Sequence, residues 1–202
     1  MTCGGLPKLP PHAPGLKIGL LGGSFNPAHE GHRGASLMAL NRLGLDRVWW
    51  LVSPANPLKD ARGLAPHATR VAAAAEHARE PRIEVTGIEA EIGARYTYQT
   101  IRYLKRRCRG VHFVWIMGAD NLAVFDRWQH WREIAASVPI AVIDRPGSTL
   151  FATHARAALA LAPYRHDESE GRRFASMKPP AIIFLHGPRS SLSSTALRAH
   201  GR

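Results

Sequence analysis

A glycine-rich turn followed by two histidines is the part of this sequence that most clearly points to chemistry. The turn comprises Gly22, Gly23, Ser24 and Phe25, and the histidines are His29 and His32. Glycine lets a backbone approach a phosphate group closely, and a helix that begins after such a turn presents unpaired N–H groups and the positive end of its dipole. Histidines there add hydrogen bonds or positive charge against phosphate oxygens. The string therefore predicts a nucleotide-binding site.

The same residues have simpler explanations. A Gly-Gly pair before a helix is often only a tight turn, and a histidine there is often a solvated helix cap. Two histidines three positions apart also suit a metal ion. Neither the Gly-x-Gly-x-x-Gly dinucleotide fingerprint nor the Gly-Lys-Ser/Thr ending of the Walker loop occurs in this turn. Without a nearby cysteine or a third clear ligand, a metal site is the weaker alternative.

The segments around this string predict the fold. Residues 18–21 are an apolar run typical of a buried strand, and residues 33–43 are expected to form a helix. Further strands are expected over residues 48–52, 83–85, 111–117, 140–143 and 181–185, and further helices over residues 69–79, 98–107, 131–136, 155–162 and 194–199. Apolar strands that alternate with helices are typical of a parallel sheet covered on both faces. The predicted fold class is α/β, a Rossmann-like doubly wound parallel sheet with helices on both faces.

Polar strings follow the carboxyl ends of the predicted strands, where ligands bind in sheets of this kind. They span residues 22–32, 53–59, 118–128, 144–147 and 186–198. Their recurrence at one edge of the sheet is stronger evidence for a ligand site than any one of them. The segment over residues 163–180 is polar and basic, and we expect it to be a long, mobile loop.

Length and composition predict one domain. The chain has 202 residues, 45% of them hydrophobic, and it contains no apolar run of transmembrane length, which predicts a soluble protein. Residues 1–15 are rich in Pro and Gly, so we expect a flexible leader before a single domain over residues 16–202. The two cysteines, Cys3 and Cys108, exclude a disulfide framework and a cysteine-based zinc site, which fits a cytoplasmic location.

The net charge of +12 favours an anionic partner. Strongly basic proteins bind nucleic acids, anionic membranes or phosphorylated small molecules. The densest basic cluster, residues 102–107, lies on an expected helix, where a solvated face is a more common explanation than an RNA-binding patch. No RNA-binding or helix-turn-helix signature accompanies it. We therefore expect small-molecule polyanions as substrates, and no nucleic acid or membrane as a partner.

A second string with the chemistry of an anion site lies near the end of the sequence. It contains Ser193, Ser194, Thr195 and Arg198 at the expected start of the last helix. The hydroxyl groups alone would explain a helix cap. Hydroxyls, unpaired N–H groups and an arginine one turn later would also bind phosphate. The residues by themselves leave both explanations open.

Both strings match signatures of a known superfamily. Residues 22–32 resemble the Gly-Gly-x-Phe-Asp/Asn-Pro-x-His-x-Gly-His signature of the nucleotidyltransferases, and residues 192–198 resemble their Ile-Ser-Ser-Thr-x-Ile/Leu-Arg signature, with Leu192 in place of Ile. Three further strings resemble the nicotinate-nucleotide adenylyltransferase family within it, namely residues 56–59, 96–100 and 118–128. Asn26 departs from the pattern, since many members carry Asp there. We expect Asn26 to shape the turn and to bond backbone groups.

The resemblance implies a role for each matching residue. The turn over residues 22–25 would pass under ATP, and His29 and His32 would contact the ATP phosphates, His32 being the better candidate for the α-phosphate. Asp120 would accept hydrogen bonds from a ribose, although a helix cap explains it equally well. The remaining phosphates would be bound by Ser193, Ser194, Thr195 and Arg198. The resemblance thus implies His29, His32 and Arg198 as catalytic residues.

The resemblance also implies a second substrate site, for nicotinate mononucleotide. Trp128 would stack on the pyridine ring, although core packing is its alternative explanation. Backbone N–H groups near Thr97 and Trp128 would hold the ring carboxylate. Asn56, Lys59 and Arg145 would lie near this mononucleotide. Other aromatic and histidine residues are left to the core or the surface, and these are Trp49, Trp50, His67, His77, His130, His154, His166 and His200.

The implied reaction is adenylyl transfer from ATP to nicotinate mononucleotide, with Mg²⁺ held mainly through the ATP phosphates. One alternative is another transferase of the superfamily, with nicotinamide mononucleotide or phosphopantetheine as acceptor. Another is a non-catalytic basic protein that binds nucleotides or RNA. The sequence leaves the oligomeric state open, with a homo-oligomer as one outcome.

Overall fold

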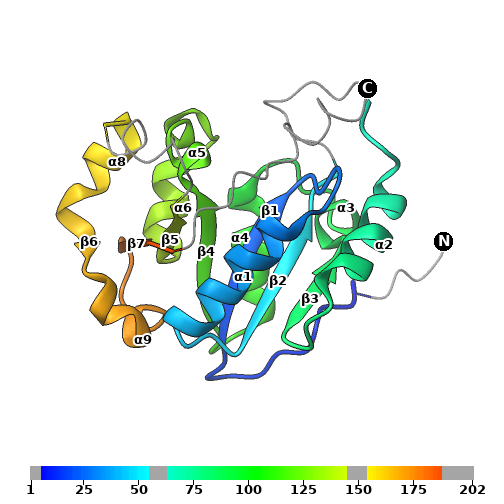
Figure 1. Ribbon diagram of the computed structural model, residues 1–202, viewed down its shortest axis with the longest axis horizontal. Coiled ribbons are helices and arrows are strands. Elements are labelled where there is room, and N and C mark those ends of the chain that lie inside the picture. The colour runs from blue at the N-terminus through cyan, green and yellow to red at the C-terminus, as the bar shows by residue number, and fades with distance from the viewer. Residues whose placement is uncertain (1–5, 55–62, 145–153, 188–202) are drawn as a thin grey trace.

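The computed structural model of the protein describes residues 6–54, 63–144 and 154–187, and the structural statements below concern these residues (Figure 1). Its strands form one seven-stranded sheet in the order β3-β2-β1-β4-β5-β7-β6, in which every neighbouring pair is parallel. The strands are β1 (Lys17–Gly23), β2 (Arg47–Val52), β3 (Ile83–Thr86), β4 (His112–Gly118), β5 (Ile140–Ile143), β6 (Arg165–His166) and β7 (Ile182–Leu185). The predicted parallel α/β sheet is confirmed.

Helices connect the strands. The α-helices are α1 (Glu30–Arg42), α2 (His67–Ala78), α3 (Ile88–Glu91), α4 (Thr97–Arg107), α5 (Ala119–Leu122), α6 (Trp131–Ser137), α8 (Arg156–Leu161) and α9 (Gly171–Phe174). Short 3-10 helices are η1 (Phe125–Arg127), η2 (Ala162–Tyr164) and η3 (Glu168–Glu170). Within the described ranges, no helix combines the length and the apolar composition needed to cross a membrane.

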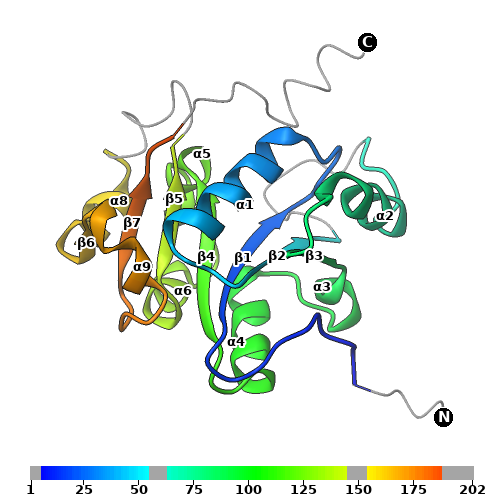
Figure 2. The same cartoon turned by 60° about the horizontal axis from the view of Figure 1, so that its bottom comes forward.

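The helices cover the two faces of the sheet and create two separate hydrophobic cores. Successive strand residues point to opposite faces, so in β2 Trp49 packs into one core and Trp50 into the other. Helices α1, α2 and α9 close the core that contains Trp50, and α3, α4, α5, α6 and α8 close the core that contains Trp49 (Figure 2). Both tryptophans are fully buried, which confirms their predicted place in the core.

The order of the strands reverses between β1 and β4. From β1 the chain builds outward to β2 and β3 on one side, and from β4 it builds outward to β5, β7 and β6 on the other. In open parallel sheets a ligand binds outside the carboxyl ends of the strands at such a reversal. The glycine turn follows β1 and the segment with Asp120 and Trp128 follows β4, so both predicted strings start at this point.

The predicted mobile loop over residues 163–180 is wrong. This segment contains η3, α9 and the short edge strand β6, which pairs with β7 through Arg165 and His166. Phe174 is fully buried in the core that contains Trp50, and Ala175 is buried beside it. The segment is polar in composition because it is an edge of the fold, and one buried aromatic side chain is enough to anchor it.

Residues 6–15 of the expected leader lie against the domain. Leu9 packs on the core that contains Trp49, and the ring of His12 meets Trp49 edge-on with 6.0 Å between centroids. The backbone N–H of Gly15 donates to the carbonyl of Gly110 at 2.8 Å. This part of the leader therefore makes tertiary contacts, and the domain boundary at residue 16 stays a prediction.

Candidate nucleotide-binding site

The string over residues 22–32 forms the end of β1, a turn and the first residues of α1. His29 is the N-cap residue of α1, with an extended backbone (φ −154°, ψ 167°). Its ring Nδ1 accepts a hydrogen bond from the Gly31 N–H at 3.1 Å, and Nδ1 of His32 accepts one from the His29 N–H at 3.3 Å. The two histidines therefore form a reciprocal capping box, in which each satisfies an N–H group at the start of the helix.

These bonds determine which ring nitrogen carries the proton. A nitrogen that accepts from an N–H group bears no proton, so in each neutral ring the proton lies on Nε2. The two ring centroids are only 3.9 Å apart, and His29 is 4% exposed. Each ring thus has Nε2–H as its donor, the type of group that hydrogen-bonds a phosphate oxygen. The positive end of the thirteen-residue helix α1 lies at the same place.

A stack of aromatic rings holds the histidines in position. The ring of Phe25 lies 5.0 Å from Trp50 and 4.6 Å from His32, measured between centroids. Trp50 Nε1 donates to the hydroxyl of Ser36 at 2.7 Å, and this hydroxyl donates to the His32 carbonyl at 2.9 Å. Phe25 is 1% exposed and has a left-handed backbone (φ +46°), a strained conformation that fixed surroundings must maintain. Any contact of Phe25 with ATP would therefore come from its backbone.

Asn26 ties the turn to the residues before α2. Its side-chain Nδ2 donates to the carbonyl of Gly63 at 3.1 Å, and its Oδ1 accepts from the N–H of Ala65 at 3.4 Å. The prediction that Asn26 bonds backbone groups is confirmed. An aspartate could supply the acceptor but not the donor, so the amide suits this pair of partners.

Glycine at position 22 has a packing reason that the sequence did not reveal. A Cβ atom on Gly22 would lie 2.7 Å from Cη2 of Trp115, which is buried on the neighbouring strand β4. A Cβ atom on Gly23 would lie 3.3 Å from the Phe25 ring. The two glycines at the end of β1 therefore leave space for the side chains of Trp115 and Phe25. The contact of these glycines with ATP stays a prediction.

The segment after β4 carries the predicted ribose and pyridine residues. Asp120 is exposed on the first turn of α5. Trp128 is half-buried and directs its ring edge-on toward Phe125 at 5.4 Å and toward Trp115 at 6.2 Å between centroids. Trp128 thus packs partly against the core and keeps part of its ring exposed, so it combines features of both explanations given above.

The start of α4 lies beside this segment. Thr97 is the first residue of α4, and the next residue, Tyr98, packs its ring 4.5 Å from the ring of His130. Tyr98 follows Thr97 and His130 lies two residues beyond Trp128, so the segments that carry these two predicted ring-carboxylate residues meet at this contact. His130, which the sequence assigns to the surface, is exposed but takes part in this contact.

A buried carboxyl group on α3, that of Glu89, is hydrogen-bonded to α4. Glu89 on α3 is almost fully buried, and the hydroxyl of Thr100 on α4 donates to it at 2.9 Å. Burial raises the pKa of Glu89 from 4.5 to about 7, because water no longer stabilises the ionised form, while the Thr100 hydrogen bond acts in the opposite direction. Thr100 lies one helical turn after Thr97, so the pair fixes the beginning of α4.

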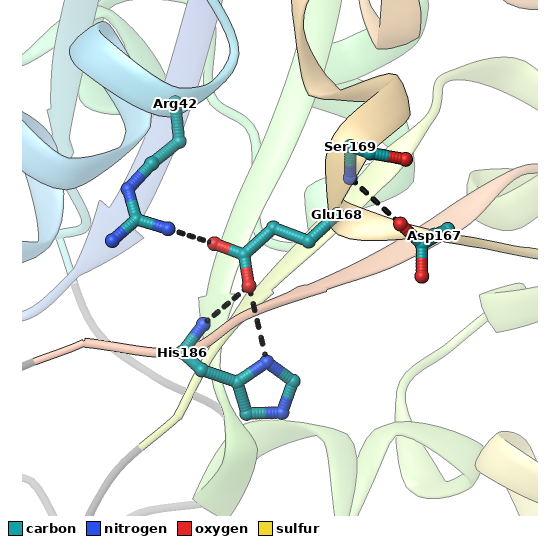
Figure 3. A network of polar contacts seen from close by, with 5 residues as sticks. All are labelled: Arg42, Asp167, Glu168, Ser169 and His186. Atoms are coloured by element: carbon teal, nitrogen blue, oxygen red, sulfur yellow. Dashed lines mark hydrogen bonds and ion pairs between the residues drawn. The ribbon is translucent and has the colours of Figure 1, made fainter.

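The exit of β7 is held by a polar network around Glu168 (Figure 3). One carboxylate oxygen of Glu168 pairs with Arg42 at the end of α1. The other accepts from the backbone N–H of His186 at 3.4 Å and contacts its ring Nδ1 at 3.2 Å. His186 directly follows β7, so the network fixes the point from which the chain continues toward the second predicted phosphate string.

Nine of the sixteen predicted site residues lie among the described residues, and seven lie outside them. The described residues include Gly22, Gly23, Ser24, Phe25, His29, His32, Thr97, Asp120 and Trp128, which all lie at the carboxyl edge of β1 or β4 or at the start of α4. Outside the described residues lie Asn56, Lys59, Arg145, Ser193, Ser194, Thr195 and Arg198. Sequence reasoning missed Arg70, which lies inside α2, and Glu89, which follows β3 in a segment that was not singled out. Tyr98 lies in the predicted string over residues 96–100 but was given no role of its own.

Comparison with known proteins identifies the chain's relatives. A family model described as cytidylyltransferase-like matches residues 20–200. A protein of Bradyrhizobium sp. (strain ORS 278) named probable nicotinate-nucleotide adenylyltransferase is 58% identical over 183 residues, which cover 91% of this chain and 95% of the relative. Proteins with the same name from Methylorubrum extorquens and Rhizobium meliloti are 59% and 52% identical, and each match covers 91% of this chain and 99% or 98% of the relative.

Solved structures show the same fold at much lower identity. A Plasmodium falciparum nicotinic acid mononucleotide adenylyltransferase, complexed with NaAD, aligns with a TM-score of 0.66 at 17% identity. The alignment covers 91% of this chain and 83% of that one. The same protein complexed with APC aligns with a TM-score of 0.64.

Proposed function

Because the chain belongs to the nicotinate-nucleotide adenylyltransferase family, we infer that it transfers the adenylyl group of ATP to nicotinate mononucleotide. The products are nicotinate adenine dinucleotide and pyrophosphate. Identity of 52–59% to curated relatives over 91% of the chain carries this inference. The capped histidine pair at the start of α1 agrees with it, since a phosphate transfer needs donors fixed at such a place.

The chemistry requires positioning more than it requires a protein nucleophile. A phosphate oxygen of nicotinate mononucleotide is already ionised, so it attacks the α-phosphorus of ATP directly. A P–O bond forms to the α-phosphorus, the bond from that phosphorus to the bridging oxygen of the β-phosphate breaks, and pyrophosphate leaves with the electron pair. The transferring group keeps its charge on oxygen atoms, and fixed donors stabilise that charge in the transition state.

The proposed roles of His29 and His32 follow from their capping bonds. Each Nδ1 accepts from a backbone N–H group, so the ring proton lies on Nε2, which is the proposed donor toward an ATP phosphate. The same bonds, together with the Phe25 ring against His32, restrict rotation of the imidazoles. Donors that are already oriented need no reorganisation when charge develops, and this makes them effective.

The nicotinate ring is proposed to lie between the start of α4 and the segment after β4. The contact of Tyr98 with His130 joins the segments that carry Thr97 and Trp128, and this supports the proposal. The first N–H groups of α4 lack helical partners, so they can donate to the ring carboxylate. The exposed part of the Trp128 ring can stack on the pyridine ring. Asp120 is proposed as acceptor for a ribose hydroxyl of ATP.

Several residues keep the roles that the family resemblance implies. Ser193, Ser194, Thr195 and Arg198 are proposed to bind the other ATP phosphates, and Asn56, Lys59 and Arg145 to lie near the mononucleotide. A cytoplasmic location is likewise a proposal, and the oligomeric state stays open, with a homo-oligomer as one outcome. The net charge of +12 would attract the small anionic substrates to the protein.

Mg²⁺ is proposed to be held mainly by the ATP phosphates. Mg²⁺ prefers oxygen ligands, whereas the side chains at the start of α1 that are proposed to contact the ATP phosphates are imidazoles, which suit softer metals. Among the residues that the structure describes, there is no group of three or more His, Cys, Asp or Glu side chains able to hold a metal ion. When bound, the ion would neutralise part of the charge on the leaving pyrophosphate.

Product analysis tests the proposed function. Purified protein is incubated with ATP, Mg²⁺ and nicotinate mononucleotide, and the products are identified by mass spectrometry. The proposal expects nicotinate adenine dinucleotide and pyrophosphate in equal amounts, and neither when the mononucleotide is omitted. Pyrophosphate release without the mononucleotide, or no dinucleotide in its presence, would contradict the proposal.

A further inference from the structure

Arg70 is a buried cation whose partners are carbonyl groups. It lies on α2 and is 2% exposed. Its Nε donates to the carbonyl of Ala65 at 2.9 Å, and its two terminal nitrogens donate to the carbonyls of Ser24 at 2.6 Å, Ser53 at 2.8 Å and Pro54 at 2.9 Å. Four of the five guanidinium N–H donors are thus used on the backbone of three different segments.

The positive charge of Arg70 has no carboxylate partner within the described residues, where its hydrogen bonds all go to carbonyl oxygens. Burial lowers the pKa of Arg70, but the ordinary pKa of a guanidinium is so high that the group stays protonated. A buried charge is costly to a protein unless something compensates it. Carbonyl dipoles compensate part of this cost, and a bound anion would compensate more.

The location of Arg70 suggests which anion that is. Ser24 lies in the turn after β1, and Ser53 and Pro54 directly follow the neighbouring strand β2. The Ser53 N–H also donates to the Gly23 carbonyl at 2.9 Å. The ends of β1 and β2 are therefore connected both by this backbone hydrogen bond and by the Arg70 side chain. The guanidinium therefore lies under the turn to which the proposed function assigns the ATP phosphates.

We propose that Arg70 is a positioning residue for adenylyl transfer, which locks the turn after β1 to the exit of β2 and supplies positive charge beneath the bound phosphates. This inference rests on the proposed function. Arg70 would contribute in two ways. Its several N–H donors would hold the turn after β1 in position, and its positive charge would attract the phosphates. Lysine keeps the charge and loses the fork, whereas methionine of similar length loses both.

The test compares Arg70→Lys and Arg70→Met with the wild-type protein, and Arg79→Met serves as the control. Arg79 is an exposed arginine at the end of the same helix, where its Nε donates to the carbonyl of Glu76 at 3.1 Å. We expect kcat to fall about a hundredfold in both Arg70 variants, as is typical when a reacting group is displaced by about 1 Å. We expect the dissociation constant of ATP, measured by calorimetry without the second substrate, to rise about tenfold in Arg70→Met and less than about threefold in Arg70→Lys. The control should match the wild type in both.

The ATP dissociation constant and the exchange rate of amide hydrogens can both be measured without turnover, so they test the role of Arg70 separately from activity. Without substrate, we expect faster exchange over residues 22–26 and 53–54 in both Arg70 variants than in the wild type. Circular dichroism shows whether each variant is folded. If Arg70→Met does not fold, the comparison of Arg70→Lys with the wild type tests the inference. Folded Arg70 variants with wild-type kcat, ATP affinity and exchange would overturn the inference. A wild-type protein that makes no dinucleotide would overturn the proposed function instead, while ATP affinity and exchange would still decide the role of Arg70.

Discussion

The buried carboxyl group of Glu89 makes the stability of this protein depend on pH in an unusual direction. Its pKa is about 7 in the folded protein, against an ordinary value of 4.5. Between these two values the folded state holds a proton that the unfolded state has lost. The free energy of unfolding therefore falls as pH rises through this range, whereas salt-bridged carboxylates give the opposite slope.

The size of the effect follows from the same two values. One pKa unit corresponds to about 1.4 kcal/mol, so the contribution of Glu89 changes by about 3 kcal/mol between about pH 4 and about pH 8. This contribution is fully present below pH 4.5, is lost as pH rises through 7, and is constant above that. Such a change is a large fraction of the roughly 5–15 kcal/mol that is typical of the total stability of a domain.

Glu89→Gln is the perturbation that isolates this contribution. The amide oxygen can still accept from the Thr100 hydroxyl, but the group no longer titrates. We expect the variant to gain stability relative to the wild type by about 3 kcal/mol when pH is raised from about 4 to about 8. The control is Glu91→Gln, which removes an exposed carboxylate from the same helix α3.

Urea unfolding at several pH values, followed by tryptophan fluorescence, measures the difference. The slope of stability against pH should differ between Glu89→Gln and the wild type, and it should be the same in Glu91→Gln and the wild type. Equal slopes in all three proteins would show that Glu89 ionises normally in the folded state. The account of a neutral, buried carboxyl group beneath α4 would then be refuted.

Three further substitutions test the site. His32→Ala should lower kcat about a hundredfold with little change in the unfolding midpoint, because a fixed donor to the transferring phosphate is lost; near-normal turnover would contradict that role. Trp128→Ala should mainly raise KM for nicotinate mononucleotide in initial-rate assays, and an unchanged KM would assign Trp128 to the core. Gly22→Ala should cost about 1–3 kcal/mol in urea unfolding, because its Cβ would meet Trp115. The matched Gly34→Ala, with open space around it in α1, should be neutral or stabilising, so equal losses in both would contradict the packing argument.

Six of the seven strands could be predicted from the sequence because most of their residues are apolar, whereas β6 was missed because both of its residues are polar. Strand β5 was predicted at its observed bounds, and β1 and β2 extend the predicted runs by only one to three residues. Both faces of these strands are buried, so each residue had to be apolar, and the pattern was unambiguous. The position of the ligand strings at the carboxyl ends followed from the topology of any such sheet.

The starts of helices were harder to predict. Helix α1 begins at Glu30, three residues before the predicted start, because His29 and His32 form its cap. A histidine cap was one of the explanations that the sequence left open, but only the structure shows that both rings accept from backbone N–H groups. The short helix α9 was missed because its charged neighbours dominate the segment, and only long-range packing around Phe174 holds it in place.

The residues that support the site were hidden for a related reason. Arg70 occupies one position in an alanine-rich helix, where an arginine usually faces water. Its partners Ser24 and Ser53 are 46 and 17 residues away in sequence, so only the folded chain reveals the contacts. Glu89 was missed similarly, since a buried carboxyl group and an exposed one look the same in a sequence.

The most direct test of the central claim is pyrophosphate release from ATP, measured in parallel with nicotinate mononucleotide, with nicotinamide mononucleotide and with neither. The account predicts rapid release with the acid, much slower release with the amide and none without an acceptor. Preference for the amide would preserve the chemistry and refute the carboxylate pocket at Thr97 and Trp128. No release with either acceptor would contradict adenylyl transfer to a pyridine mononucleotide altogether.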